Sequence, residues 1–236
     1  MGALAVIREQ FTFILTVLGV LAGLFLAAKG CERLCRLSFP RNARALALCA
    51  MCAALSGLMM LVEIPLFFAP EFYKLDFSEL PVMLCTLSLG PAAGVVCEFL
   101  KVLIKLLLKG TTSAFVGEFA NFLVGCALLL PASLLYHRKN RLLPALAVGV
   151  LSMTGFGSLL NAYYLLPKFC QLYGMPMEAI LAMAQGVNPA IQSVSKLVLF
   201  AVVPFNLLKG FLISLLCLLL YPRLKPLLSR EQRKNS

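Results

Sequence analysis

An asparagine and a lysine stand three residues apart near the carboxyl end of the chain, within a strongly apolar stretch. The stretch reads Val203-Pro204-Phe205-Asn206-Leu207-Leu208-Lys209-Gly210. A bilayer offers no water to an amide or an ammonium group, so an ionisable residue inside a membrane helix indicates a functional site. No acidic residue lies close to Asn206 and Lys209 in the sequence, so an ion pair within the same helix does not explain them.

Further polar and aromatic residues cluster near the expected outer ends of other apolar segments. They are Phe67, Phe68, Phe72, Tyr73, Lys74 and Asp76; Lys109, Gly110, Thr111, Thr112, Glu118 and Asn121; and Asn161, Tyr163 and Tyr164. Aromatic faces suit a flat ring, and amides suit the hydrogen-bonding edge of such a ring. The pattern predicts a pocket for a small ligand that opens outward.

Some of these residues also have a purely structural interpretation. Asp76 and Glu79 have the spacing of a helix-capping box, and Thr111 with Thr112 can cap the helix that follows. One of the two adjacent tyrosines can lie in the aromatic belt at the membrane surface. The sequence leaves these alternatives open.

The acidic residues of the apolar segments allow two other interpretations. Glu98, Lys101 and Lys105 share one face of a helix, which favours an internal ion pair over ligand contact. Glu118 or Asp76 could serve as the base of a small intramembrane enzyme. The sequence contains neither H-E-x-x-H nor G-x-S-x-G, so an enzyme is not expected.

The composition indicates the class of protein. Hydrophobic residues make up 61% of the 236 residues and charged residues 13%, and the mean hydropathy is +0.93. These values are typical of a polytopic membrane protein. Because the apolar runs do not alternate with polar residues, they predict an all-α helical bundle rather than a β-barrel. Nucleic-acid binding is not expected despite the net charge of +11.

The apolar runs and the basic residues between them predict the topology. The expected spans are residues 11–28, 44–62, 79–90, 91–108, 113–136, 142–167 and 204–221. Basic clusters follow the first, fifth and last of these spans, and therefore fall on one side, which should be cytoplasmic. Residues 168–202 then form an external segment with an amphipathic helix. Pro204 is expected in the first turn of the last span.

The first apolar run could instead be a signal peptide that is cleaved after residue 30 or so. Arg8 precedes its apolar core, but Glu9 spoils the basic leader. The basic cluster after the run is typical of a stop signal that retains the helix. An extra, uncleaved membrane helix is therefore the preferred interpretation.

Nine cysteines raise the question of a metal site. Most lie inside apolar runs, namely Cys49, Cys52, Cys85, Cys97, Cys126 and Cys217. Cys49 and Cys52 form a C-x-x-C pair, but the sequence has no second pair, and its only histidine, His137, lies in a basic loop. The cysteines are therefore interpreted as small packing residues, with no metal or cofactor expected.

Several motifs follow one another in order from about residue 43 to 226. They are Lys74-Leu75-Asp76-Phe77-Ser78-Glu79-Leu80-Pro81, Leu89-Gly90-Pro91-Ala92-Ala93-Gly94, Glu98-Phe99-Leu100-Lys101, Lys109-Gly110-Thr111-Thr112, Gly117-Glu118-Phe119-Ala120-Asn121 and Pro204 to Gly210. In this register they resemble the riboflavin-specific substrate-binding subunit (S component) of energy-coupling-factor (ECF) transporters.

The resemblance implies a domain plan and a set of partners. Residues 1–42 would hold an extra amino-terminal helix and a basic linker, 43–226 the six-helix domain, and 227–236 a basic cytoplasmic tail. The extra helix departs from the family pattern and would place the amino terminus outside. The subunit would capture riboflavin at the outer face of a bacterial cell membrane. A coupling protein and two ATPases would drive uptake, since this sequence has no phosphate-binding loop.

The resemblance also implies roles for individual residues. Asn161, Asn206 and Lys209 would hold the flavin ring, whose edge alternates hydrogen-bond acceptors with a donor. Partners for the ribityl hydroxyls would be Thr111, Thr112, Glu118 and Asn121, and Phe68 and Tyr73 would supply aromatic contacts.

Small residues on the second span suggest a docking surface. Ala43 with Ala47, and Ala50 with Ala54, have the spacing that lets membrane helices approach closely. The family uses an alanine motif on this helix to dock on the coupling protein. Ordinary packing within the bundle is the alternative.

The substrate has alternatives as well. An S component for another vitamin would share the bundle and differ in the pocket, and a binding protein without an ATPase partner would have the same sequence features. Flavin mononucleotide is a further candidate ligand. Its phosphate would need a cation near the ribityl end, such as Lys74 or Lys109.

Overall fold

A computed structural model describes residues 3–37, 43–66, 73–111 and 113–228, and almost all of them are helical. The helices are α1 (Ala3–Cys35), α2 (Ala43–Met59), α3 (Glu79–Leu89), α4 (Pro91–Lys109), α5 (Val116–Lys139), α6 (Leu142–Leu160), α7 (Leu166–Tyr173), α8 (Met177–Val187), α9 (Val194–Leu197) and α10 (Val203–Leu228). Short π-helical segments, η1 (Asn161–Leu165) and η2 (Val198–Val202), join α6 to α7 and α9 to α10. The predicted helical bundle is confirmed.

The bundle is built around α3. This short helix is buried over nearly its whole length and touches α2, α4, α5 and α10. Gly90 turns the chain directly into α4 with a φ of 100°, a conformation that favours glycine, and Pro91 occupies the first turn of α4. The core between these helices is apolar and includes Met83, Leu128 and Met153, which are fully buried.

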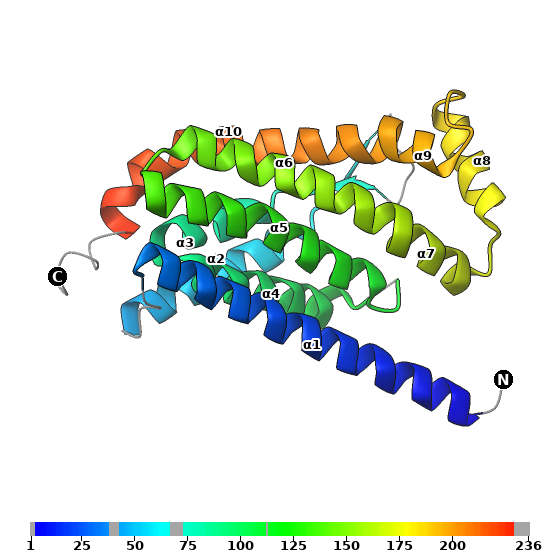
Figure 1. The fold of residues 1–236 in the computed structure, drawn as a ribbon, viewed down its shortest axis with the longest axis horizontal. Coiled ribbons are helices and arrows are strands. Elements are labelled where there is room, and N and C mark those ends of the chain that lie inside the picture. Colours follow the sequence, from blue (N-terminus) through cyan, green and yellow to red (C-terminus); the bar gives the residue numbers. More distant parts are fainter. Residues whose placement is uncertain (1–2, 38–42, 67–72, 112, 229–236) are drawn as a thin grey trace.

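The long helices run along roughly one common direction, and α8 lies across it (Figure 1). Four helical stretches are long and apolar enough to cross a membrane on their own: Leu15–Cys35, Val116–Lys139, Leu142–Tyr173 and Val194–Pro226. The end of α1, the α5–α6 turn and the end of α10 lie at the same end of the bundle in Figure 1. These are the segments with the basic clusters, so the structure agrees with a single cytoplasmic face.

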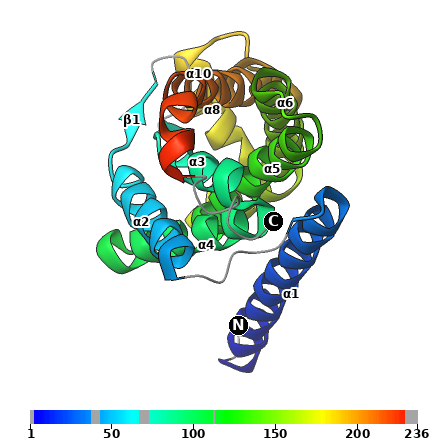
Figure 2. The same cartoon turned by 90° about the vertical axis from the view of Figure 1, so that its left-hand side faces the viewer.

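The extra helix α1 lies on the outside of the bundle. It packs against α4 and α5 through residues that include Leu21, Leu24 and Ala28. It is longer than the expected span of 11–28 at both ends, and its amino-terminal part leans away from the other helices (Figure 2). Its amino end lies opposite the basic end in Figure 1, as expected for an amino terminus outside the cell.

The last two spans are longer than expected. The sixth continues through η1 and α7 to Tyr173, and the seventh begins at Val194 in place of residue 204. The expectation that Pro204 lies in the first turn was wrong, because this proline follows an unbroken helical stretch that contains η2. A π-helical segment shifts the backbone hydrogen bonds to more distant partners, which lets the helix pass a residue without an N–H. Pro167 follows η1 in the same manner.

The outer segment between these spans contains the expected amphipathic helix. It is α8, which buries Ile180 and Ala184 one turn apart. Between α2 and α3, a two-residue antiparallel pairing joins β1 (Ile64–Pro65) to β2 (Lys74–Leu75). This pairing fixes the entry of the chain into the segment before α3.

Candidate ligand-binding site

Two asparagines from the last two spans meet at Gly157. Asn161 donates from Nδ2 to the Gly157 carbonyl at 2.9 Å and accepts from the Tyr73 hydroxyl at 2.7 Å. A Cβ atom at position 157 would lie 3.0 Å from Nδ2 of Asn206, so the absence of a side chain there permits this close approach. Asn161 and Asn206 are both buried. The structure therefore brings together the two amides that the sequence predicted for one site.

The lysine of the same helix is held by an acid from a distant segment. Lys209 Nζ lies 2.9 Å from Asp76 Oδ2 and 3.7 Å from Glu79 Oε1. The Ser78 N–H donates to Asp76 Oδ1 at 2.9 Å, and Ser78 occupies the N-cap position of α3. The capping-box interpretation of Asp76 was wrong, since Asp76 lies before the cap and orients a buried lysine.

A second buried lysine extends this charge cluster toward α5. Lys101 Nζ lies 2.8 Å from Glu79 Oε1 and 2.5 Å from Glu98 Oε1, and it donates to Asn121 Oδ1 at 3.0 Å. The ion pair expected on α4 is confirmed for Glu98 and Lys101. Lys105 pairs with Glu118 of α5 instead.

We name this set the Lys209 cluster: Asp76, Glu79, Glu98, Lys101 and Lys209. It combines three carboxylates with two ammonium groups, all buried. Oε2 of Glu79 and both carboxylate oxygens of Glu98 accept no hydrogen bond within the described part of the chain, and Glu98 is held by its ion pair with Lys101. The cluster links the segment before α3 to α3, α4 and α10, and Asn121 adds α5.

Both predicted asparagines adjoin the π-helical segments. Asn161 is the first residue of η1, and Asn206 lies on the turn after η2. The two segments contact each other, and Phe205 lies beside Tyr73 with ring centroids 5.4 Å apart. Single π-helical turns occur frequently at functional sites because they redirect side chains within a long helix.

Two of the residues predicted for a ribityl chain, Thr111 and Glu118, lie in a separate cluster. Glu118 pairs with Lys105 and accepts from the hydroxyls of Thr111 and Ser113 at 2.9 Å each. Lys105 also donates to the Gly110 carbonyl at 3.1 Å. We name Lys105, Thr111, Ser113 and Glu118 the Glu118 cluster. Asn121 is not part of it, since it accepts a hydrogen bond from Lys101 of the Lys209 cluster.

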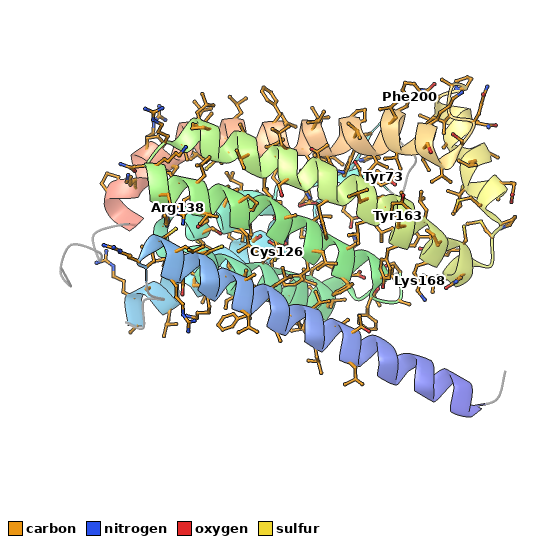
Figure 3. All side chains as sticks on the ribbon, in the orientation of Figure 1. Tyr73, Cys126, Arg138, Tyr163, Lys168 and Phe200 are labelled. Atoms are coloured by element: carbon orange, nitrogen blue, oxygen red, sulfur yellow. The ribbon has the colours of Figure 1, made fainter. Side chains whose placement is uncertain are left out.

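The structure answers several remaining sequence predictions. Phe68 and Thr112 lie outside the described residues. Tyr163 is 80% exposed, which fits the belt interpretation (Figure 3). The roles of Phe205 and of Glu79 could not be predicted from the sequence, because their contacts come from segments far apart in the chain.

Lys74 and Lys109 meet at Glu63, which the sequence did not single out. Their Nζ atoms lie 2.9 Å and 3.0 Å from Glu63 Oε2. Partial burial raises the pKa of Glu63, but hydrogen bonds from both lysines outweigh it and hold the pKa below its ordinary value. The two candidate phosphate ligands are thus brought together, with a carboxylate between them.

A cavity of about 400 Å³ lies away from the asparagines, between α1, α4 and α5. Its lining is almost entirely apolar and includes Leu18, Phe99 and Phe122; Glu118 also borders it. This cavity lacks amides and faces the helix that packs on the outside of the bundle. We therefore place the candidate site at the asparagines.

Comparison with known proteins identifies the family. The sequence model described as "ECF transporter, substrate-specific component" matches residues 44–221. The chain belongs to this family of S components. A solved structure of the S component of a bacterial ECF transporter superposes with a TM-score of 0.61 at 34% identity, covering 79% of this chain and 98% of the other.

Curated relatives of this S component are riboflavin transporters. RibU of Staphylococcus aureus (strain TCH60) is 33% identical over 198 residues, which cover 83% of this chain and 97% of the relative. FmnP of Bacillus subtilis (strain 168) is 28% identical over 187 residues, covering 78% and 93%. With its long apolar helices, this S component is a multi-pass bacterial membrane protein.

The alanines of α2 lie on the surface of this S component. Ala43, Ala47, Ala50 and Ala54 are all exposed, while Ala45, Cys49 and Ala53 face the core. The exposed alanines recur at intervals of four, three and four residues and so form one stripe along α2. Packing within the described bundle does not account for them.

Proposed function

We propose that this S component binds riboflavin between η1, η2 and the segment before α3, and delivers it for uptake. The observation that carries the proposal is the convergence of Asn161, Asn206 and Lys209, which lie on two separate spans. Two amides and an ammonium can satisfy the donors and acceptors along the edge of a flavin ring. Tyr73 and Phe205 supply adjacent aromatic faces.

In this proposal, riboflavin replaces hydrogen bonds that the side chains make to one another. The ring edge takes the place of the Tyr73 hydroxyl on Asn161, and Lys209 turns from Asp76 toward a flavin acceptor. Because each hydrogen bond that is lost between side chains is replaced by one to the flavin, no buried polar group is left without a partner. Asp76 stays close enough to balance the charge of the lysine.

Contacts to the ribityl chain would come from α5. Asn121 is only half-buried and lies one turn beyond Glu118. Glu118 and Thr111 already bind one another, so they would contribute less than the asparagines. Thr112 and Phe68 complete the set proposed from the sequence. Binding of flavin mononucleotide would require Lys74 or Lys109 to leave Glu63.

The exposed alanine stripe of α2 is the proposed contact with a membrane coupling protein. In lipid no hydrophobic force drives helices together, so their association depends on close packing. Small side chains allow that close packing. Two ATPase subunits would supply the energy, and the S component itself would catalyse no reaction. Copurification of wild-type protein with the coupling protein, and its loss on Ala47→Leu with Ala50→Leu, tests this arrangement.

The main experiment is a riboflavin titration of the purified protein in detergent, followed by flavin fluorescence. The chain has no tryptophan, so flavin emission is a clear signal. Saturable quenching that weakens in Asn206→Ala and Lys209→Ala, but not in the exposed control Lys139→Ala, supports the site. Quenching that is equal in all variants contradicts the site, and folded protein without quenching contradicts riboflavin.

The same preparation tests the alternatives. Binding of another vitamin in place of riboflavin would favour an S component with a different substrate. Turnover of a lipid phosphate or acyl ester by the isolated chain would favour an intramembrane enzyme. Neither outcome would alter the bundle or its topology.

A further inference from the structure

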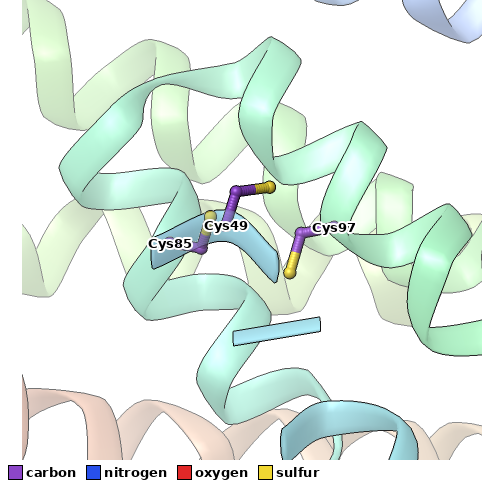
Figure 4. Close-up of side chains that lie close together, drawn as sticks. All are labelled: Cys49, Cys85 and Cys97. Carbon is purple, nitrogen blue, oxygen red and sulfur yellow. The ribbon is translucent and has the colours of Figure 1, made fainter. Parts of the chain in front are cut away.

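Three cysteine thiols from different helices meet in the interior of the bundle. Cys49 of α2, Cys85 of α3 and Cys97 of α4 have their sulfur atoms within 4.8 Å of one another (Figure 4). Their side chains are no more than 4% exposed. Cys52, one turn further along α2, is half-buried and packs against the same core. The fold therefore adds two thiols to the lone C-x-x-C pair of the sequence.

We propose that Cys49, Cys85 and Cys97 form a binding site for a soft monovalent cation, Cu(I). Thiol sulfur is the ligand type that selects soft ions. With metal–sulfur bonds of about 2.3 Å, three sulfurs around one ion stand about 4 Å apart. The observed separations meet this requirement with small side-chain adjustments.

Charge favours a monovalent ion over a divalent one. The surroundings are apolar and include Ala45, Ala53 and Ala93, so a net charge here would be costly. Thiolate sulfur is the metal ligand, so binding releases at least one proton to solvent, and a single thiolate already balances the charge of Cu(I). Zn(II) requires the loss of two protons for neutrality and prefers four ligands, of which this group supplies three.

The position of the site allows access from the reducing side of the membrane. Cys97 lies six residues after Pro91, or about 9 Å along α4 from the turn at the basic end. A cytoplasmic environment keeps these thiols reduced and available. The ion would connect the inward face of α2, opposite the alanine stripe, to α3 and α4.

The experiment uses the full chain in detergent, reduced and without oxygen, titrated with Cu(I) against a Cu(I)-selective chromophoric chelator. Cys31→Ala with Cys35→Ala removes the half-buried thiols of α1 and defines the background protein. In that background we expect one ion per chain. Affinity should fall by more than about tenfold in Cys49→Ala, Cys85→Ala or Cys97→Ala, but not in the buried control Cys126→Ala.

A second measurement separates loss of the site from loss of the fold. Cu(I) should raise the thermal midpoint of the background protein and of Cys126→Ala, because an ion that binds only the folded state stabilises it. It should leave the midpoint of a folded Cys97→Ala variant unchanged. Equal Cu(I) affinity with all three thiols removed, no binding at all, or binding of Zn(II) in preference to Cu(I) would overturn the proposal.

Discussion

Two buried charge clusters lie on the outer half of this bundle and differ in how they are assembled. The Lys209 cluster joins residues up to 133 positions apart and contains three carboxylates for two ammonium groups. The Glu118 cluster comes from residues 105–118 and balances one carboxylate with one ammonium group. A ligand can therefore change the partners of the first cluster, while the second is already satisfied by neighbours in the sequence.

The difference suggests a division of roles. A cluster whose residues come from four separate segments forms only when those segments pack correctly. Some of its carboxylate oxygens accept no hydrogen bond from the described residues, so its stability depends strongly on any change of charge nearby. A local cluster can form as soon as its loop folds. We infer that the Lys209 cluster couples ligand binding to helix packing, and that the Glu118 cluster mainly holds the α4–α5 turn.

The largest expected effect comes from removing Lys101, which is fully buried. Lys101→Met leaves Glu79 and Glu98 without their common ammonium partner. Breaking a buried pair in this way costs about 3–5 kcal/mol of unfolding free energy, measured by thermal unfolding in detergent. Lys105→Met in the Glu118 cluster should cost less. Equal losses in the two variants would remove the distinction between the clusters.

A double variant separates binding from stability at Lys209. Lys209→Met leaves the Asp76 carboxylate unpaired, so both stability and riboflavin affinity should fall. Adding Asp76→Asn should restore most of the stability, because an amide needs no counter-ion, while affinity stays lower by about tenfold or more. Recovery of riboflavin affinity in the double variant would show that the ammonium group does not contact the ligand.

Glu118→Gln should have a smaller effect on binding. The glutamine keeps the shape of the side chain and its contacts to Thr111 and Ser113, and loses the charge pair with Lys105. We expect a stability loss of about 1–2 kcal/mol and a change in riboflavin affinity below about tenfold. A loss of riboflavin affinity as large as that of Lys209→Met would show that Glu118 contacts the ligand directly.

The contrast also explains what the sequence could predict. The apolar runs and basic clusters predicted the bundle and its topology, because the bilayer imposes length and charge rules on each segment. Asn161, Asn206 and Lys209 were identified because polar groups are costly in apolar helices. The start of the last helix was misplaced, because a proline normally marks a first turn and the sequence carries no clear signal for a π-helical segment.

Partners across the fold could not be derived from the sequence. Glu98 and Lys101 share a helix and were paired correctly, whereas Asp76 with Lys209 and Glu79 with Lys101 depend on which helices are neighbours. The same limit applied to the thiols, since Cys85 and Cys97 come close to Cys49 only in the folded bundle. Local spacing predicts local contacts, and tertiary contacts require the packing order of the helices.

The smallest expected effect concerns Glu63, which is shared by Lys74 and Lys109 at the outer surface. The pKa of Glu63 is lowered in the folded protein. The ion pairs of Glu63 therefore stabilise the fold above the ordinary glutamate pKa of about 4.3, and this stabilisation is lost as the pH falls below that value. Glu63→Gln should therefore reduce the free energy of unfolding by less than about 1 kcal/mol at pH 7, since both lysines are exposed to solvent. Below pH 7, the stability of the variant should fall less steeply with decreasing pH than that of the wild type.

If flavin mononucleotide binds through these lysines, the same variant should bind it more tightly and leave riboflavin affinity unchanged, because removing the carboxylate frees two cations for the phosphate. A variant that changes the two affinities equally would place the lysines outside the phosphate site and confine Glu63 to the surface contact.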